Sequence, residues 1–225
     1  MNITHAVKEE IKGDKLDAIF NRQKELMSKY HDIEKRSGLL QTESCPVNLD
    51  DKKGQARIKD FSWRVMEELG EALDARNDLP HFKEELIDGL HFLTELTILS
   101  GLKTDDLVNM VGEYSDSNRS QYEDKLTFLY NESVYFSVTS NIGDLDLPKK
   151  AVYFVEQIAM MCNCLKNKPW KQTQMVTDKE EFYRRLKNVW IGYLSILSTC
   201  LSPDDIAEVY LKKSQVNKFR QRSNY

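Results

Sequence analysis

Apolar residues recur every three or four positions along most of the chain, which is the spacing of one face of an α-helix. Leu16, Ile19, Phe20, Leu26 and Met27 follow this spacing within residues 14–35. The same pattern predicts further helices over residues 56–77, from the break at 78–80 to 100, 104–114, 148–167, 178–200, and from 203 towards the C-terminus.

Turn-forming residues separate these segments. Gly38, Pro46 and Gly54 indicate a loop over residues 38–55, and Gly101 ends the apolar run that precedes it. The whole chain of 225 residues has only 9 Gly and 5 Pro, too few for the many tight turns of an all-β fold. We therefore predict an all-α, multi-helix bundle of six or seven helices, forming a single domain over residues 1–225.

Residues 115–149 are the part of the chain that the pattern defines least. The segment NESVYFSVTSN is compatible with a strand or a helix, and the polar turn NIGDLDLP follows it. These residues are a candidate for an inserted or mobile lobe of the domain.

Composition and charge narrow the class of protein. The net charge of −4 gives no reason to expect a nucleic-acid partner. No stretch approaches the roughly 18 apolar residues of a membrane span, and the N-terminus lacks the apolar core of a secretion signal. We therefore expect a cytoplasmic protein without a membrane partner, whose four cysteines are reduced packing residues.

Two acidic pairs, Glu68-x-x-Glu71 and Glu85-x-x-Asp88, lie on the second and third predicted helices. Residues three apart share one helix face, and helices joined by a short connection pack antiparallel. The two pairs then face each other across the seam, where close carboxylates repel unless a cation lies between them. Several oxygen ligands suit Mg²⁺ better than zinc. The alternative is two ordinary solvent-exposed acidic faces.

A second candidate stripe lies near the C-terminus. Lys213, Asn217 and Arg220 are spaced i, i+4, i+7, so they share one face of the last helix. Their point charge, amide and forked guanidinium suit phosphate oxygens. The alternative is a basic helix end that complements the helix dipole.

Together these motifs resemble the all-α NTP pyrophosphatase superfamily, which includes MazG-type enzymes, dimeric dUTPases and phage dCTPase-dUTPases. The segment EELIDGLHFL is similar to the dUTPase/dCTPase branch, where a His-Phe pair follows the Asp. Gln23 in FNRQKELM resembles the N-terminal residue that reaches the base in that family. The segment YLKKSQVNKFRQRSNY resembles the closing signature of the branch at Tyr210, Lys213, Asn217, Arg220, Gln221 and Tyr225.

The resemblance implies a Mg²⁺-dependent enzyme that hydrolyses a deoxynucleoside triphosphate, with dUTP as the leading substrate, to the monophosphate and diphosphate. It implies a homodimer and two or more Mg²⁺ ions, for which Mn²⁺ can substitute. Either Glu71, which we favour, or Glu68 would act on the attacking water. The implied site has metal ligands Glu68, Glu71, Glu85 and Asp88, phosphate ligands Lys213, Asn217, Arg220 and Tyr210, base ligand Gln23, and pocket candidates Trp63, His91, Gln221 and Tyr225.

Departures from the family pattern leave the base open. Met27 stands where dimeric dUTPases usually carry Asn, and Asn224 replaces the usual Gly before the last Tyr. The short gap between the acidic pairs is closer to the MazG pattern. The alternatives are dCTP, a modified pyrimidine or broad MazG-type hydrolysis, and, outside enzymes, a helical adaptor with acidic faces. Trp63 and His91 are also explained by core packing.

Overall fold

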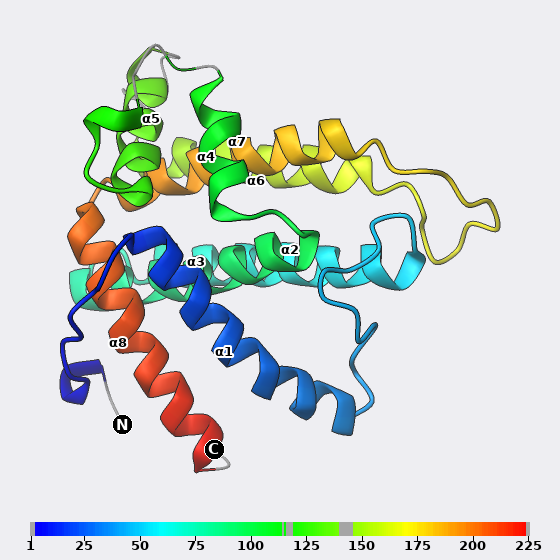
Figure 1. Ribbon diagram of the computed structural model, residues 1–225, viewed down its shortest axis with the longest axis horizontal. Coiled ribbons are helices and arrows are strands. Elements are labelled where there is room, and N and C mark those ends of the chain that lie inside the picture. Colours follow the sequence, from blue (N-terminus) through cyan, green and yellow to red (C-terminus); the bar gives the residue numbers. More distant parts are fainter. Residues whose placement is uncertain (1–2, 114, 116–118, 140–145, 224–225) are drawn as a thin grey trace.

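The computed structural model describes residues 3–113, 115, 119–139 and 146–223, apart from the side chain of Thr4. Within these ranges the chain forms eight α-helices, two short 3-10 turns and no strand (Figure 1). The α-helices are α1 (Lys15–Arg36), α2 (Lys52–Asp74), α3 (Leu79–Ser100), α4 (Thr104–Gly112), α5 (Lys125–Thr139), α6 (Leu147–Cys164), α7 (Lys179–Leu197) and α8 (Pro203–Arg222). The 3-10 turns are η1 (Ile3–His5) and η2 (Arg119–Gln121). The predicted all-α fold is confirmed.

Side-chain caps explain where the helices that build the site begin. The carboxylate of Asp51 accepts from the backbone N–H groups of Lys53 and Gly54, so α2 starts four residues before the predicted position. Asp78 caps α3, and Ser202 forms a capping box at the start of α8. At the other end of α3, Gly101 has φ +87°, the left-handed conformation predicted for the residue that ends this helix.

The central unit of the fold is the antiparallel pair α2 and α3, which lie side by side in Figure 1. The core-facing stripe of α2 includes Val65 and Leu69, and that of α3 includes Leu86, Leu90 and Leu93, all at most 2% exposed. This apolar seam fixes which faces of the two helices meet. It therefore also sets the positions of the polar residues that flank it.

The remaining helices surround this pair. α1 and α8 pack against each other and against α3, so residues near the two ends of the chain meet beside the central seam. α6 and α7 form a second antiparallel pair (Figure 1), and α5 packs against α7. No helix in the described ranges combines the length and apolarity needed to cross a membrane.

The segment 115–149, which could have been strand or helix, contains α5 in its described part. Leu126, Phe128 and Leu129 of α5 are completely buried in the same core as α2 and α3. This helix brings the described number to eight, so the expected six or seven was too low by at least one. The sequence left strand and helix open here because the apolar residues are not confined to one face: Tyr135 and Val138 are 57% and 65% exposed.

Candidate metal and nucleotide site

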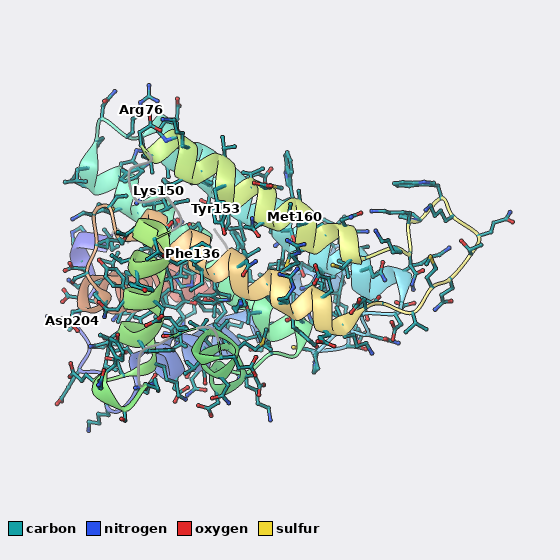
Figure 2. The ribbon with its side chains drawn as sticks, turned by 90° about the horizontal axis from the view of Figure 1, so that it is seen from above. Arg76, Phe136, Lys150, Tyr153, Met160 and Asp204 are labelled. Carbon is teal, nitrogen blue, oxygen red and sulfur yellow. The ribbon has the colours of Figure 1, made fainter. Side chains whose placement is uncertain are left out.

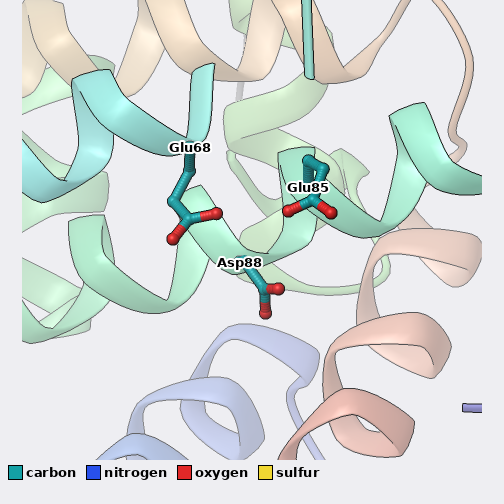
Figure 3. A group of neighbouring side chains, drawn as sticks. All are labelled: Glu68, Glu85 and Asp88. Atoms are coloured by element: carbon teal, nitrogen blue, oxygen red, sulfur yellow. The ribbon is translucent and has the colours of Figure 1, made fainter. Parts of the chain in front are cut away.

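Three carboxylates meet across the seam between α2 and α3. Glu68 comes from α2, and Glu85 and Asp88 come from α3 (Figure 3). Each offers an oxygen, and these oxygens all lie within 4.8 Å of one another. All three side chains are half-buried. The structure therefore brings together three of the four predicted acids.

The close approach of the helices here depends on Gly89. A Cβ atom at this position would lie 3.3 Å from Cβ of Glu68 and only 2.1 Å from the hydroxyl oxygen of Tyr193. That hydroxyl, fully buried, donates a 2.7 Å hydrogen bond to the backbone carbonyl of Leu86. The absence of a side chain at Gly89 thus lets α2, α3 and α7 converge just behind the acids.

The cluster carries more negative charge than its surroundings balance. Burial, together with repulsion from Asp88, Glu71 and Glu85, raises the pKa of Glu68 to about 8. Burial also raises the pKa of Asp88 to about 6, although Lys213 opposes this rise. Carboxyls whose pKa is raised by burial and by each other are typical of a site that a cation completes.

Lys213 of α8 reaches Asp88 of this cluster. Its ammonium nitrogen lies 2.6 Å from an oxygen of Asp88 and 2.6 Å from an oxygen of Glu84. The side chain is only 5% exposed. Nearby, Nε2 of His81 lies 2.7 Å from Glu85. Lys213, predicted as a phosphate ligand, therefore lies beside the acids: it contacts Asp88 of the cluster and the neighbouring Glu84.

Glu71 occupies a different position from the other three acids. It is exposed, and it lines an open depression of about 920 Å³ on the α2 surface together with Glu67, Glu68 and Asp74. Its carboxylate is not part of the cluster whose oxygens lie within 4.8 Å. Glu71 thus borders the acidic cluster on the side open to water.

A smaller cavity of about 250 Å³ lies next to Glu68 and Asp88. Four elements enclose it: α1, α2, α3 and α8. Asn217 and Arg220 of α8, two of the three residues in the C-terminal stripe, line it. The other lining residues are Gln23, Leu26, Tyr30, Arg64, His91, Phe92 and Glu95.

Gln23 lies at the buried end of this cavity and is 2% exposed. Its amide oxygen accepts a 2.7 Å hydrogen bond from the hydroxyl of Tyr210 and lies 2.8 Å from Nδ1 of His91. Its amide nitrogen donates to Glu95 at 2.8 Å. Burial lowers the pKa of His91 to about 3, so the ring is neutral, and Nδ1 must be the donor to an oxygen that can only accept. The rings of His91 and Tyr210 stack, 3.7 Å apart.

A buried charged network lies behind Gln23. The guanidinium of Arg57 is fully buried and donates to Glu34 at 2.8 Å, and Arg64 pairs with both Glu34 and Asp60. Burial raises the pKa of Glu95, the remaining carboxyl of this region, to about 7. The cavity thus has acids at both ends: the cluster at one end and Glu95 at the other.

Other candidates lie further from the cavity. Trp63 is 58% exposed on α2 and is not among the residues that line the cavity. Tyr210 is completely buried, with its hydroxyl bound to Gln23. Gln221 is half-buried beside Tyr30, and Tyr225 lies outside the described residues.

The sequence motifs did not include two residues of this region, Glu84 and Glu95. Glu84 shares Lys213 with Asp88, and its position next to Glu85 concealed it within an acidic run. Glu95 had a readable signal: it is the lone acid in the apolar run LHFLTELTIL, seven residues after Asp88. Such spacing places both on one stripe of α3.

Comparison with known families adds one match. The sequence model of the dUTPase family matches residues 72–225, which is more than half of the chain. The matched region contains Glu85, Asp88 and the α8 stripe, and it begins just after Glu68 and Glu71. No curated protein and no solved structure matched the chain.

Proposed function

The chain belongs to the dUTPase family, and from this premise we propose that it hydrolyses dUTP to dUMP and diphosphate in a Mg²⁺-dependent reaction. The observation that carries the proposal is the cluster of Glu68, Glu85 and Asp88 beside a cavity of about 250 Å³, with Lys213 of α8 paired to Asp88. A solvent-exposed acidic face would have neither the shared position nor the raised pKa values of these carboxyls.

The acids fit a hard divalent cation. All the donors are carboxylate oxygens, close enough to share an ion, and the raised pKa of Glu68 reflects negative charge that nearby groups do not neutralise. Glu68, Glu85 and Asp88 would hold Mg²⁺, with Glu71 available at the rim for a further ion. When bound, Mg²⁺ supplies the positive charge that screens the triphosphate and stabilises its transition state.

Glu71, Lys213, Asn217 and Arg220 would then have separate roles in the reaction. Glu71, at the exposed rim, orients the attacking water and takes its proton as the water oxygen bonds to the α-phosphorus. The bond between the α-phosphorus and the oxygen that bridges it to the β-phosphate breaks. Diphosphate leaves with that oxygen and the electrons of the bond. Lys213 exchanges part of its contact with Asp88 and Glu84 for phosphate oxygens, and Asn217 and Arg220 bind the rest of the chain of phosphates.

In this arrangement the base enters the 250 Å³ cavity and approaches Gln23. Tyr210 then acts as a positioning residue, because its hydroxyl holds the Gln23 amide and is not available to phosphate. His91 has the same role from the other side of the amide oxygen.

A panel of deoxynucleoside triphosphates with diphosphate detection tests the proposal. We expect Mg²⁺-dependent release of diphosphate from dUTP. We expect Asp88→Asn to lower kcat at least about 100-fold, because substituting even the residues that hydrogen-bond to a metal ligand costs up to about that factor. Glu67→Gln, on the same surface of α2 but outside the cluster, is the matched control. Turnover of a purine triphosphate with neither dUTP nor dCTP accepted would contradict the substrate.

A homodimer is part of the same proposal. α5 and α6 expose apolar side chains next to each other: Tyr135 is 57% and Val152 is 70% exposed, and the rings of Phe136 and Tyr153 lie 6.3 Å apart (Figure 2). Apolar area of this kind is a surface that a second copy can cover. Light scattering during size-exclusion chromatography measures the mass directly, and a monomer at micromolar concentration would refute this part.

A further inference from the structure

Glu95 is a buried carboxyl with one oxygen that lacks a donor. The residue is 3% exposed, and its Oε2 accepts the hydrogen bond from the amide of Gln23. Its Oε1 has no hydrogen-bond partner among the described residues. Arg57 is 3.9 Å away, which is too long for a hydrogen bond. A buried polar atom without a partner is costly, so a donor from outside the chain would be favourable here.

Glu95 lies in the wall of the cavity that the base is proposed to enter. It lines the same 250 Å³ cavity as Gln23 and Asp88, and on α3 it follows Asp88 by seven residues, or two turns. This volume is below the roughly 300–1,000 Å³ of typical small-molecule sites, so it suits one ring and not a whole nucleotide.

The orientation of Gln23 is fixed by its neighbours. Its oxygen faces the hydroxyl of Tyr210 and Nδ1 of His91, so its nitrogen must face Glu95. An amide nitrogen carries two hydrogens, and only one of them is used by Oε2 of Glu95. The second N–H has no acceptor among the contacts of this nitrogen, as Oε1 of Glu95 has no donor in the described part of the chain. One unused donor and one unpartnered acceptor therefore belong to two side chains that are hydrogen-bonded to each other.

We propose that Glu95 determines the base specificity of this site: its unpartnered oxygen accepts the N3–H of uracil, and the second N–H of Gln23 donates to the adjacent carbonyl. The inference rests on the proposed function. An ionised carboxylate can only accept hydrogen bonds. Because N3 carries a hydrogen in uracil and a lone pair in cytosine, Glu95 selects the first base and repels the second.

The surrounding charges agree with this role. Arg64 also lines the cavity, but its guanidinium is paired with Glu34 and Asp60. Oε1 of Glu95 therefore keeps its capacity to accept a hydrogen bond. Burial raises the pKa of Glu95 to about 7, because the ionised form is poorly solvated there. A ring N–H would supply the missing hydrogen bond. Arg57, on the far side, favours the ionised form.

The substitution Glu95→Gln tests the proposal with almost no change of shape. The Gln23 amide nitrogen would still need an acceptor, so the oxygen of the new side chain turns towards it and its NH₂ group faces the base. An acceptor is thereby exchanged for a donor. We expect kcat/KM for dUTP to fall at least about tenfold while that for dCTP falls less than about threefold or rises. Glu132→Gln, a buried carboxyl on α5 outside this cavity, should leave the dUTP to dCTP ratio unchanged.

Binding of dUMP and dCMP in EDTA, measured by calorimetry, separates base reading from metal chemistry. Glu95→Gln should lower the preference for dUMP by the same factor of about ten. An unchanged ratio in the folded variant, or equal losses for both bases, would overturn the proposal. If Glu95→Gln does not fold, Glu95→Asp, which withdraws the carboxylate by one methylene, should reduce the same preference. A wild-type protein that prefers dUMP through Glu95 yet hydrolyses no triphosphate would refute the proposed function and leave this inference intact.

Discussion

The substitution Glu68→Gln should stabilise the metal-free protein, although Glu68 is placed at the centre of the site. Burial and three neighbouring carboxyls raise the pKa of Glu68 from 4.5 to about 8. The folded state therefore holds a proton that the unfolded chain releases above pH 4.5, and stability falls as the pH rises from 4.5 through 8. At about 1.4 kcal/mol for each tenfold change, full ionisation would cost the fold about 5 kcal/mol.

Partial solvent access reduces this figure. Glu68 is half-buried, and water screens part of the repulsion, so a penalty of about 1–3 kcal/mol at pH 7.5 is a realistic expectation. Glutamine keeps the shape and removes the charge. The midpoint of urea unfolding at pH 7.5 in EDTA should therefore rise, and the difference from wild type should shrink to nothing near pH 4.5, where both side chains are neutral.

Magnesium should reverse the order of the two proteins. An ion that binds only the folded state stabilises it, so Mg²⁺ should raise the unfolding midpoint of the wild type and have much less effect on Glu68→Gln. Glu67→Gln, the exposed neighbour, should behave like the wild type in both conditions. A lower midpoint for Glu68→Gln in EDTA, or no dependence of the difference on pH, would refute the argument that the acids repel each other in the empty site.

Three other substitutions probe the frame around the site. Lys213→Met removes the buried partner of two carboxylates and should destabilise the metal-free fold by about 3 kcal/mol, measured by urea unfolding. Arg57→Met should cost about 3 kcal/mol in the same assay, because it removes the fully buried cation that lies beside both Glu34 and Glu95. Gly89→Ala should cost about 1–3 kcal/mol, since its Cβ would clash with the hydroxyl of Tyr193. Gly70→Ala, a helix-interior position with open space, should instead gain about 0.5–1 kcal/mol, and equal effects at the two glycines would contradict the clash.

The helices and their pairing could be read from the sequence because one physical signal dominates both. The apolar stripes of α2 and α3 define their facing sides, and the short connection through Asp78 leaves them little choice except to pack antiparallel. The starts were less accurate. Helix α2 begins at Lys52, because the side chain of Asp51 caps a polar first turn that apolar spacing cannot reveal.

The candidate site was predictable in part for the same reason. Glu68, Glu85 and Asp88 follow the stripes, so the helical repeat alone places them together, and Lys213 is related to them by its own stripe on α8. The spacing of the Glu68-x-x-Glu71 motif could not show that Glu71 lies at the rim. Two helical residues that are three positions apart still point in directions that differ by about 60°. Nor could it show the Gln23 network, because its members come from α1, α3 and α8 and meet only through tertiary packing.

The stripe that runs along α3 from Asp88 to Glu95 has a consequence for how the molecule can vary. Two turns of helix separate Asp88 from Glu95 by about 10.5 Å, so in the proposed complex the phosphates would lie at one end of this span and the base at the other. Inserting any single residue between Asp88 and Glu95 would rotate one of these side chains away from the other by about 100° around the helix axis. Length changes should therefore be tolerated in the exposed part of the α6–α7 connection, residues 169–173, and should disrupt the proposed site within this stretch of α3.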